Sequence, residues 1–220
     1  MNALRRIGAI GDVHCEDRYL AAALDHLHGL EVDAVVCVGD IVDGQGNVNR
    51  TCELLRMAEV RCVAGNHERW LLAGEMRSLD DGTPIESLNP DHLAWLRALP
   101  PTLRLPTAAG SLMLCHGIAD DDMAVLRADT RGYALQELGA LRDLMVDPTV
   151  DFMVGGHTHE RMVRRFQGLT VINAGTLHRD YGAGFALVDF EDMEVHFFDL
   201  EASTVRLAAT KPLPPPAPLP

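Results

Sequence analysis

Val38-Gly39-Asp40-Ile41-Val42-Asp43 is the stretch around which the other motifs of this chain can be arranged. The apolar run before it, residues 34–38, predicts a buried strand that ends at the glycine. Asp40 follows at the end of that strand. A carboxylate there could reach two cations at once, since paired ions in hydrolytic sites lie roughly 3.5–4 Å apart. Many α/β proteins place an aspartate in this position, so the other segments must decide whether Asp40 bridges two metal ions.

The composition bounds the class of protein. The chain has 220 residues, 47% of them apolar, which is enough for one domain with a buried core. We expect a single domain over residues 1–210 and a proline-rich, extended or disordered tail over residues 211–220. A net charge of −13 argues against general nucleic-acid binding. No apolar run approaches the roughly 18 residues of a membrane span, so we expect a cytoplasmic protein.

The cysteines predict no disulfide framework and no zinc knot. They are odd in number and form no CxxC pair, and most of them lie in apolar surroundings: Cys15, Cys37, Cys52, Cys62 and Cys115. We expect buried free thiols. The oligomeric state stays open.

The N-terminal part predicts a strand, a helix and a second strand. Residues 6–11 form a short apolar run, Leu20 to Leu27 carry a helical apolar stripe, and residues 33–39 form the second run. Such a βαβ unit pairs its strands in parallel through a right-handed crossover. The loops after both strands then meet at one edge of the sheet, where α/β folds place their sites.

Asp12 and His14 follow the first predicted strand directly, so we expect both to lie near Asp40. Residues i and i+2 of an extended backbone point to the same side. The pair could therefore hold one ion from the end of the strand.

The rest of the chain predicts further short elements. Strands are expected at residues 60–64, 103–105, 111–115, 150–154, 169–173, 185–190 and 194–200, helices at 54–58 and 133–146, and a mostly helical connection at 69–101. The last two strands are expected to form a hairpin. No internal repeat is present.

Polar side chains recur at the ends of these predicted strands. The candidate metal ligands are Asp12, His14, Asp40, Asn66, His116, His157 and His159. A lone histidine at a strand end is more often a hydrogen-bonded structural residue. Five segments with the same pattern point to a site, because a core does not need so many buried polar groups. Oxygen and imidazole ligands together suit Mn²⁺, Fe or Zn²⁺, with Ni²⁺ also possible.

The order Asp-x-His, Gly-Asp-x-x-Asp, Gly-Asn-His-Glu, His-Gly and Gly-His-x-His resembles the calcineurin-like metallophosphoesterase superfamily. The resemblance extends from Gly11 to His159. It implies a four-layer α/β/β/α sandwich of two mixed β-sheets flanked by helices, with a dinuclear site on loops at one end. It further implies that one ion is held by Asp12, His14 and His159, the other by Asn66, His116 and His157, and that Asp40 bridges them.

Two ions in this arrangement imply a hydrolytic reaction. A water shared between them becomes a bridging hydroxide near neutral pH and can attack phosphorus. His67, next to a metal ligand, is placed to protonate the leaving alkoxide as general acid. In relatives with these motifs the second aspartate orients that histidine, so Asp43 would pair with His67. A turn cap is the alternative role for Asp43.

The departures from the superfamily pattern bear on the substrate. Gly44 and Ala64 stand where the Ser/Thr phosphoprotein phosphatases have arginines. Their absence weakens the hypothesis that this chain is a phosphoprotein phosphatase. The late residues 173–176 resemble the small bacterial phosphodiesterase-like members. Many of these lack a histidine at position 67, so monoesters stay open. Arg179 and His178 are candidates for substrate binding, although a surface salt bridge would also explain Arg179.

The sequence thus favours a phosphoesterase that uses two divalent transition-metal ions, most readily Mn²⁺, on a small-molecule phosphodiester or phosphomonoester. Two alternatives remain. One is a metal-binding scaffold, as the retromer subunit of this fold is regarded. The other is a phosphoprotein phosphatase despite the missing arginines.

Overall fold

Two mixed sheets form the centre of the protein, whose computed structural model describes residues 3–215. The strands are β1 Arg6–Ile10, β2 Ala34–Cys37, β3 Arg61–Cys62, β4 Thr102–Thr107, β5 Gly110–Cys115, β6 Phe152–Gly155, β7 Met162–Arg165, β8 Thr170–Asn173, β9 Gly184–Asp189, β10 Glu194–Glu201 and β11 Thr204–Pro212. The helices are α1 Asp17–Gly29, α2 Val48–Met57, α3 Asn66–Ala73, α4 Pro90–Arg97, α5 Gly132–Gln136 and α6 Gly139–Val146, with 3₁₀ turns η1 Ile85–Ser87 and η2 Arg179–Tyr181.

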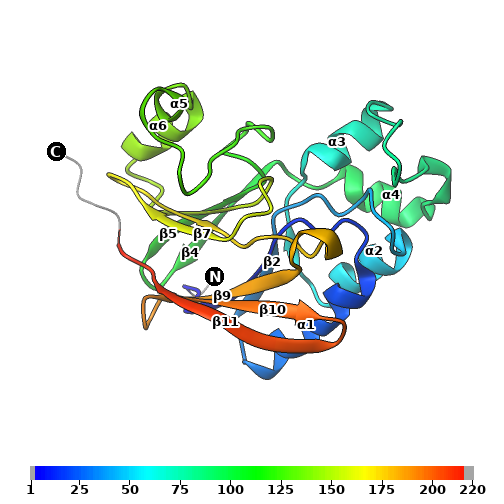
Figure 1. Ribbon diagram of the computed structural model, residues 1–220, viewed down its shortest axis with the longest axis horizontal. Helices are drawn as coiled ribbons and strands as arrows, with labels where there is room; N and C mark the ends of the chain where they lie inside the picture. Colours follow the sequence, from blue (N-terminus) through cyan, green and yellow to red (C-terminus); the bar gives the residue numbers. More distant parts are fainter. Residues whose placement is uncertain (1–2, 216–220) are drawn as a thin grey trace.

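The strand order confirms the predicted class of fold. One sheet has the order β11-β10-β9-β1-β2-β3 and the other β4-β5-β6-β8-β7. β1, β2 and β3 pair in parallel, as the βαβ prediction required, and β9 joins β1 antiparallel. Figure 1 shows α1 and α2 on one side of the molecule and α5 and α6 on the opposite side. The result is a four-layer sandwich with helices outside and sheets inside.

Alternating side chains build the layers. In β5, Leu112 and Leu114 belong to the core between the sheets, whereas Met113 and Cys115 face the core shared with α6. This follows from the twofold side-chain period of a strand, which sends neighbours to opposite faces. Both faces of the central strands are therefore buried, and their polar residues are confined to the strand ends, where the chain leaves the sheet.

The predicted helix at 133–146 is wrong in its continuity. The chain forms α5 and α6 with a break at Glu137 and Leu138, and the N–H of Gly139 donates to the carbonyl of Glu137 at 2.9 Å. Leu135 and Leu138 both pack against the core under the second sheet. The break lets both leucines reach that core, so tertiary packing overrides the helical propensity of the segment.

The connection at 69–101 is also less helical than expected. Only α3, η1 and α4 are helical there, and residues 74–84 form turns after Gly74, whose φ of 71° ends α3 in the left-handed conformation. Left-handed glycine is a common helix C-cap because it has no Cβ. This irregular segment reaches the candidate site, as described below.

Two strands were not foreseen, and both are edge strands. β7 and β11 pair antiparallel with β8 and β10, respectively. β11 is exposed along most of its length, so it lacks the buried pattern by which a strand is recognised in a sequence. β11 runs through Pro212 and Leu213 is buried, so the first residues of the predicted tail, 211–220, are extended and packed on the fold, and the boundary of the tail stays a prediction. Residues 216–220 lie outside the described part of the chain.

The thiol prediction is confirmed within the described residues, where all five cysteines are buried and free. No helix in residues 3–215 is long and apolar enough to cross a membrane.

Candidate functional site

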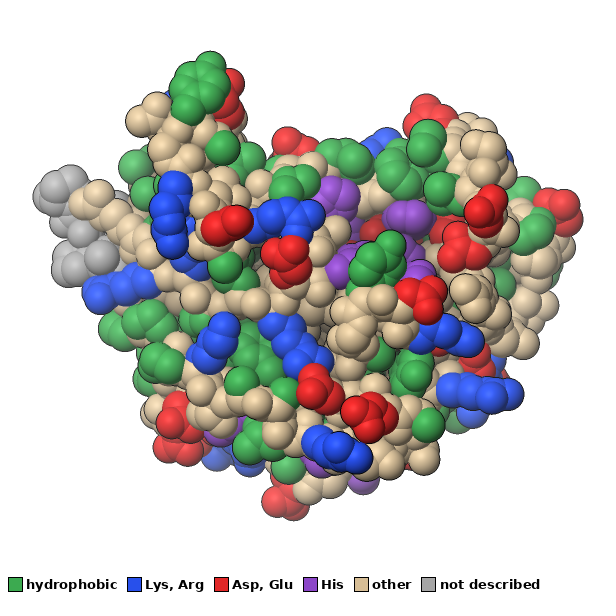
Figure 2. Space-filling model, in the orientation of Figure 1, with side chains coloured by type: hydrophobic (Ala, Val, Ile, Leu, Met, Phe, Trp, Pro, Cys, Tyr) green, Lys and Arg blue, Asp and Glu red, His purple; other side chains and the backbone are tan. Residues whose placement is uncertain are grey.

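The loops that follow the central strands converge at one edge of the two sheets. Figure 2 shows histidine side chains gathered in a hollow of the surface, close to several acidic side chains. The loop after β1 carries Asp12 and His14, and its backbone is bound to the loop after β8 through Thr176, whose hydroxyl donates to the carbonyl of Asp12 at 2.7 Å. Segments from both sheets therefore meet at this point.

Asp12, His14 and His159 form a first group, here called the Asp12 cluster, whose ligand atoms lie within 4.8 Å of one another. The Nε2 atoms of His14 and His159 are 3.2 Å apart, and His159 Nε2 is 3.8 Å from Asp12 Oδ1. Three potential ligand atoms thus face a common point. This is the set predicted for one ion.

Asp40, His116 and His157 form a second group, the Asp40 cluster, with the same mutual spacing. His116 Nε2 is 3.2 Å from Asp40 Oδ2, and Asn66 Oδ1 lies 2.9 Å from His116 Nε2 and 3.0 Å from His157 Nδ1. Asp40 Oδ2 is also 3.9 Å from His14 Nε2. Asp40 Oδ2 thus lies within 4 Å of a histidine of each cluster.

Two of the histidines are oriented by backbone carbonyls. His14 Nδ1 donates to the carbonyl of Asp43 at 2.8 Å, and His116 Nδ1 donates to that of Val38 at 2.9 Å. Each ring then presents Nε2 to the centre. Metal-bound histidines usually donate their other ring N–H in this way, which fixes the tautomer and the ring orientation.

The electrostatics of the clusters suit a cation. Burial lowers the pKa of His14 and of His157, and it lowers that of His159 to about 3, where the neighbouring His14 ring further disfavours protonation. These rings are therefore neutral and offer lone pairs. Burial would lower the pKa of His116 too, but the Asp40 and Asp12 carboxylates raise it to about 10. The carboxylates thus draw positive charge into the site.

One buried oxygen tests whether a metal ion fits. Asp12 Oδ2 has no hydrogen-bond partner among the described residues, although the side chain is fully buried. Burial raises the pKa of Asp12 to about 7, because the charged form is poorly solvated there. A Cβ at Gly156 would lie 2.6 Å from this oxygen, so only glycine leaves room beside it. The other oxygen of the carboxylate, Oδ1, lies 3.8 Å from His159 Nε2 and 3.7 Å from His116 Nε2. Carboxylate and imidazole donors gathered in this way fit a divalent transition metal.

The backbone of the ligand segments differs from the extended conformation that was predicted for Asp12 and His14. His14, His157 and His159 instead have φ values of 46°, 66° and 60°, in the left-handed region. Asp40 and Asp43 share this conformation, with φ of 47° and 61°. Such strain is uncommon in non-glycine residues and is concentrated at functional sites, where surrounding contacts impose it.

Glu68 imposes part of this geometry. Its buried carboxylate accepts the backbone N–H groups of Asp40 at 2.9 Å, Ile41 at 2.7 Å, Val42 at 3.1 Å and Gly65 at 2.8 Å. The loop after β2 is thereby fixed to the start of α3. Glu68 stands in the Gly-Asn-His-Glu motif, yet its structural role was not foreseen, because a contact between two distant loops leaves no local pattern.

The structure brings Asp43 and His67 together. His67 Nδ1 lies 2.8 Å from Asp43 Oδ2, and His67 Nε2 lies 3.9 Å from Asp40 Oδ2. Arg77 and Thr83, from the irregular segment after α3, also bind Asp43. Burial would raise the pKa of Asp43, but the hydrogen bonds from His67 and Arg77 lower it to about 2. Neither Arg77 nor Thr83 has a sequence signal.

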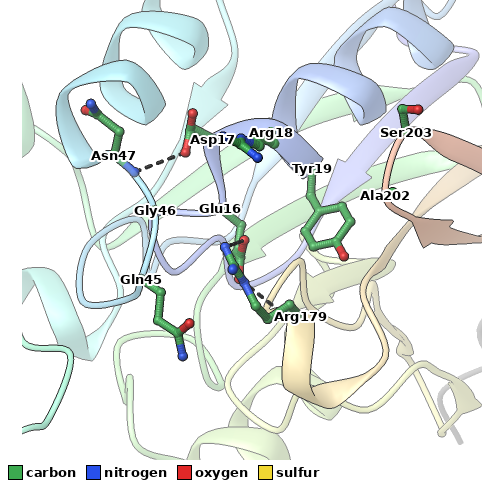
Figure 3. Close-up of a pocket in the computed structure, with 10 residues that line it drawn as sticks. All are labelled: Glu16, Asp17, Arg18, Tyr19, Gln45, Gly46, Asn47, Arg179, Ala202 and Ser203. Atoms are coloured by element: carbon green, nitrogen blue, oxygen red, sulfur yellow. Dashed lines mark hydrogen bonds and ion pairs between the residues drawn. The ribbon is translucent and has the colours of Figure 1, made fainter.

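A pocket of about 780 Å³ lies between the start of α1, the loop at residues 45–47, η2 and the turn before β11, and none of the residues that line it belongs to either cluster. Figure 3 shows Tyr19, Gln45 and Arg179 around it. Arg179 makes a bidentate ion pair with the buried carboxylate of Glu16, at 2.6 and 2.7 Å. The alternative considered for Arg179, a salt bridge, is therefore present.

His178 lies beside the Asp12 cluster. Its ring centroid is 5.2 Å from that of His14 and 6.2 Å from that of His159, and the exposed Tyr181 packs against both His159 and His178. His178 is thus at the rim of the site, and its role in substrate binding stays a prediction.

Comparison with known proteins identifies the family. The pattern of the calcineurin-like phosphoesterase superfamily domain matches residues 6–193 of the 220. The chain belongs to this superfamily. The superfamily is metal-dependent, and the two clusters are groups of His and Asp side chains that could bind a metal ion.

Individual relatives are more distant. Uncharacterized protein MJ0912 of Methanocaldococcus jannaschii is 35% identical over 74 residues, a match that spans 34% of this chain and only 30% of that protein. A metallophosphoesterase structure from Sphaerobacter thermophilus has a TM-score of 0.66 at 23% identity and covers 90% of this chain and 89% of its own. Hypothetical protein PH1004 from Pyrococcus horikoshii has a TM-score of 0.71 at 18% identity, with coverage of 90% and 88%. These two structures share the fold.

Proposed function

We propose that this protein is a hydrolase of small phosphodiesters or phosphomonoesters that uses two divalent metal ions. Asp12, His14 and His159 would hold one ion, Asn66, His116 and His157 the other, and Asp40 both. The single observation that carries the proposal is the pair of His and Asp clusters, whose histidines His14 and His116 both lie within 4 Å of Asp40 Oδ2.

The metal ions would lower the pKa of a water molecule to make a nucleophile, and would neutralise charge that develops on the phosphoryl oxygens. The mixed imidazole and carboxylate donors suit Mn²⁺, and also Fe, Zn²⁺ or Ni²⁺.

His67 would act as the general acid. Its Nδ1–H donates to Asp43, so the protonated ring carries its second proton on Nε2, which faces Asp40 across 3.9 Å. Burial would lower the pKa of His67, but the hydrogen bond with Asp43 and the negative charges of Asp40 and Glu68 raise it. A leaving oxygen bound near Asp40 could therefore take the proton from Nε2.

One contact argues against the phosphoprotein phosphatase alternative. A Cβ at Gly44 would lie 1.9 Å from the carbonyl oxygen of His14. An arginine cannot stand there without displacing the backbone that carries His14. The geometry around His14 therefore requires glycine where those phosphatases carry a phosphate-binding arginine, which favours small esters.

The test is turnover of bis(p-nitrophenyl) phosphate and p-nitrophenyl phosphate by protein stripped of metal and then loaded with Mn²⁺. Metal content per chain is measured alongside. We expect metal-dependent activity that falls about a thousandfold or more in Asp40→Asn, because both ions lose a ligand. Asp120→Asn, the same change on an exposed loop, is the matched control and should keep full activity.

The outcomes separate the alternatives. Full metal-dependent activity in Asp40→Asn would show that Asp40 is not the bridging ligand. Two bound ions without activity on either ester would favour a scaffold, and turnover of phosphopeptides far above both esters would favour a phosphoprotein phosphatase. The ratio between the two esters sorts diesterase from monoesterase.

A further inference from the structure

The Asp43 carboxylate accepts hydrogen bonds from Arg77 and Thr83 in addition to its contact with His67. Oδ1 accepts the backbone N–H of Thr83 at 2.7 Å and Arg77 Nη1 at 2.9 Å. Oδ2 accepts Arg77 Nη2 at 2.9 Å and lies 2.8 Å from His67 Nδ1. A carboxylate has about four lone-pair positions, so each one has a donor. The carboxylate cannot rotate without breaking several of these bonds.

Arg77 is itself fixed. Its Nε donates to the carbonyl of Glu75 at 2.6 Å, and Nη1 also reaches the carbonyl of Thr83 at 3.3 Å. The hydroxyl of Thr83 in turn accepts the backbone N–H of Asp43 at 2.9 Å. The irregular segment at 74–84 therefore binds both the backbone and the side chain of Asp43.

The ion pair between Arg77 and Asp43 differs from exposed arginine pairs such as that between Arg104 and Asp147. The Asp43 side chain is 0% exposed, whereas Asp147, paired with Arg104 on β4, is 27% exposed. Exposed pairs contribute little, because water screens them. A buried carboxylate that accepts two hydrogen bonds from one planar guanidinium is kept ionised and is fixed in orientation. A lysine cannot reproduce this bidentate geometry.

We infer that Arg77 is a positioning residue for the general acid: its guanidinium holds the Asp43 carboxylate so that Oδ2 meets His67 Nδ1 and Nε2 of His67 faces Asp40. This inference rests on the proposed function, in which His67 protonates the leaving group. Arg77 touches neither cluster. It acts through Asp43 on the direction of one ring, and displacement of a catalytic group by about 1 Å can cost a hundredfold in rate.

The test compares two monoesters that differ in the leaving group, phenyl phosphate and p-nitrophenyl phosphate, on the metal-loaded protein. In Arg77→Met we expect kcat for phenyl phosphate to fall about 10- to 100-fold, as for other residues that orient a reacting group. With the better nitrophenolate leaving group the fall should stay below about threefold, because that group needs little protonation. KM should not change for either ester.

Two further variants make the comparison specific. Arg77→Lys keeps the positive charge but loses the two parallel N–H donors of the guanidinium. It should therefore shift the ratio of kcat for the two esters in the same direction by a smaller factor. Arg104→Met removes an arginine from an ion pair on the outer strand β4 and should leave both rates unchanged. If Arg77→Met does not fold, Arg77→Lys carries the test, and an unaltered ratio there would overturn the inference.

A second measurement does not depend on turnover. Nitrogen-15 NMR of the histidine rings in the metal-free protein, assigned with His67→Gln, should show the Nδ1 proton of His67 protected in the wild type. That proton should exchange with solvent faster in Arg77→Met than in the wild type. In Arg104→Met it should exchange at the wild-type rate. Equal losses with both esters, or an unchanged His67 signal, would reduce Arg77 to a structural residue and overturn the inference.

The two proposals fail in different ways. A wild-type protein inactive on both esters with any metal would count against the proposed function, while the ring signals would still decide whether Arg77 positions His67. An active wild type whose Arg77→Met variant keeps the ester ratio would leave the function standing and remove Arg77 from it.

Discussion

Asp12 and Asp43 are the same residue type at nearly the same burial, 0% and 1% exposed, and their surroundings are opposite. Asp12 Oδ2 has no partner in residues 3–215, and burial raises the pKa of Asp12 to about 7. Asp43 has a donor at every lone pair, and His67 and Arg77 lower its pKa to about 2 against the effect of burial. The chain provides a cation, Arg77, for the Asp43 carboxylate. The Asp12 carboxylate instead belongs to a cluster that could bind a metal ion.

The largest expected difference between the surroundings of Asp12 and those of Asp43 is in the effect of substitutions on turnover. Asp12→Asn should lower kcat about a thousandfold with phenyl and p-nitrophenyl phosphate alike, because a metal ligand acts on every substrate. His67→Ala, on the Asp43 side, should cost about a hundredfold or more with phenyl phosphate and much less with the nitrophenyl ester. Steady-state rates on both esters decide this. Equal losses for His67→Ala would remove its role as an acid.

The next difference is in the stability of the metal-stripped protein. Asp43→Asn should lower the free energy of unfolding by about 2–3 kcal/mol, since it leaves Arg77 beside a neutral amide. Asp12→Asn should cost less than about 0.5 kcal/mol, because it removes a buried charge whose second oxygen has no donor in the described chain.

Urea unfolding in EDTA measures both values, and addition of Mn²⁺ supplies the contrast. The metal should stabilise the wild type and Asp43→Asn, and should stabilise Asp12→Asn far less. If Asp12→Asn instead destabilised the stripped protein as much as Asp43→Asn, the Asp12 carboxylate would already be satisfied by the chain itself.

The smallest effect is local and concerns Cys15. Burial raises the pKa of its thiol to about 12, and its Sγ lies 3.7 Å from the hydroxyl of Thr83. The thiol is thus protonated at pH 8 and should react slowly with iodoacetamide. Asp43→Asn loosens Thr83, so labelling of Cys15 should rise severalfold while Asp12→Asn leaves it unchanged.

Peptide mapping by mass spectrometry after a short pulse of reagent reads this out. Cys115, buried under the second sheet with a pKa also raised to about 12, is the internal control. A parallel rise at Cys115 would mean that the whole fold has loosened.

Much of the candidate site could be predicted from the sequence because the candidate ligands come shortly after strands. Asp12, Asp40 and His116 lie directly after short apolar runs, and strand ends of neighbouring parallel strands meet at one edge. The conformations of the ligands could not be predicted in this way. The left-handed backbone at His157 and His159 arises from contacts with other segments, for example the bond from the N–H of His157 to Asp12 Oδ1 at 2.9 Å.

The same limit explains the elements that were wrong or missed. β11 is recognised by pairing with β10 and by little in its own exposed residues. The break between α5 and α6 depends on which leucines reach a core that distant strands supply. Local periodicity reports on burial along one segment, and it is silent where a partner elsewhere in the chain decides the conformation.

The sequence by itself determined the layered α/β class, the positions of the polar strand ends and the chemistry of their donors, because these depend on the order of residue types along single segments. Only the tertiary structure decided that Asp12 keeps an unsatisfied oxygen, that Glu68 fixes the Asp40 loop, and that Arg77 closes on Asp43. Each of these depends on side chains that meet across more than twenty residues of chain, where burial makes a hydrogen bond or its absence costly.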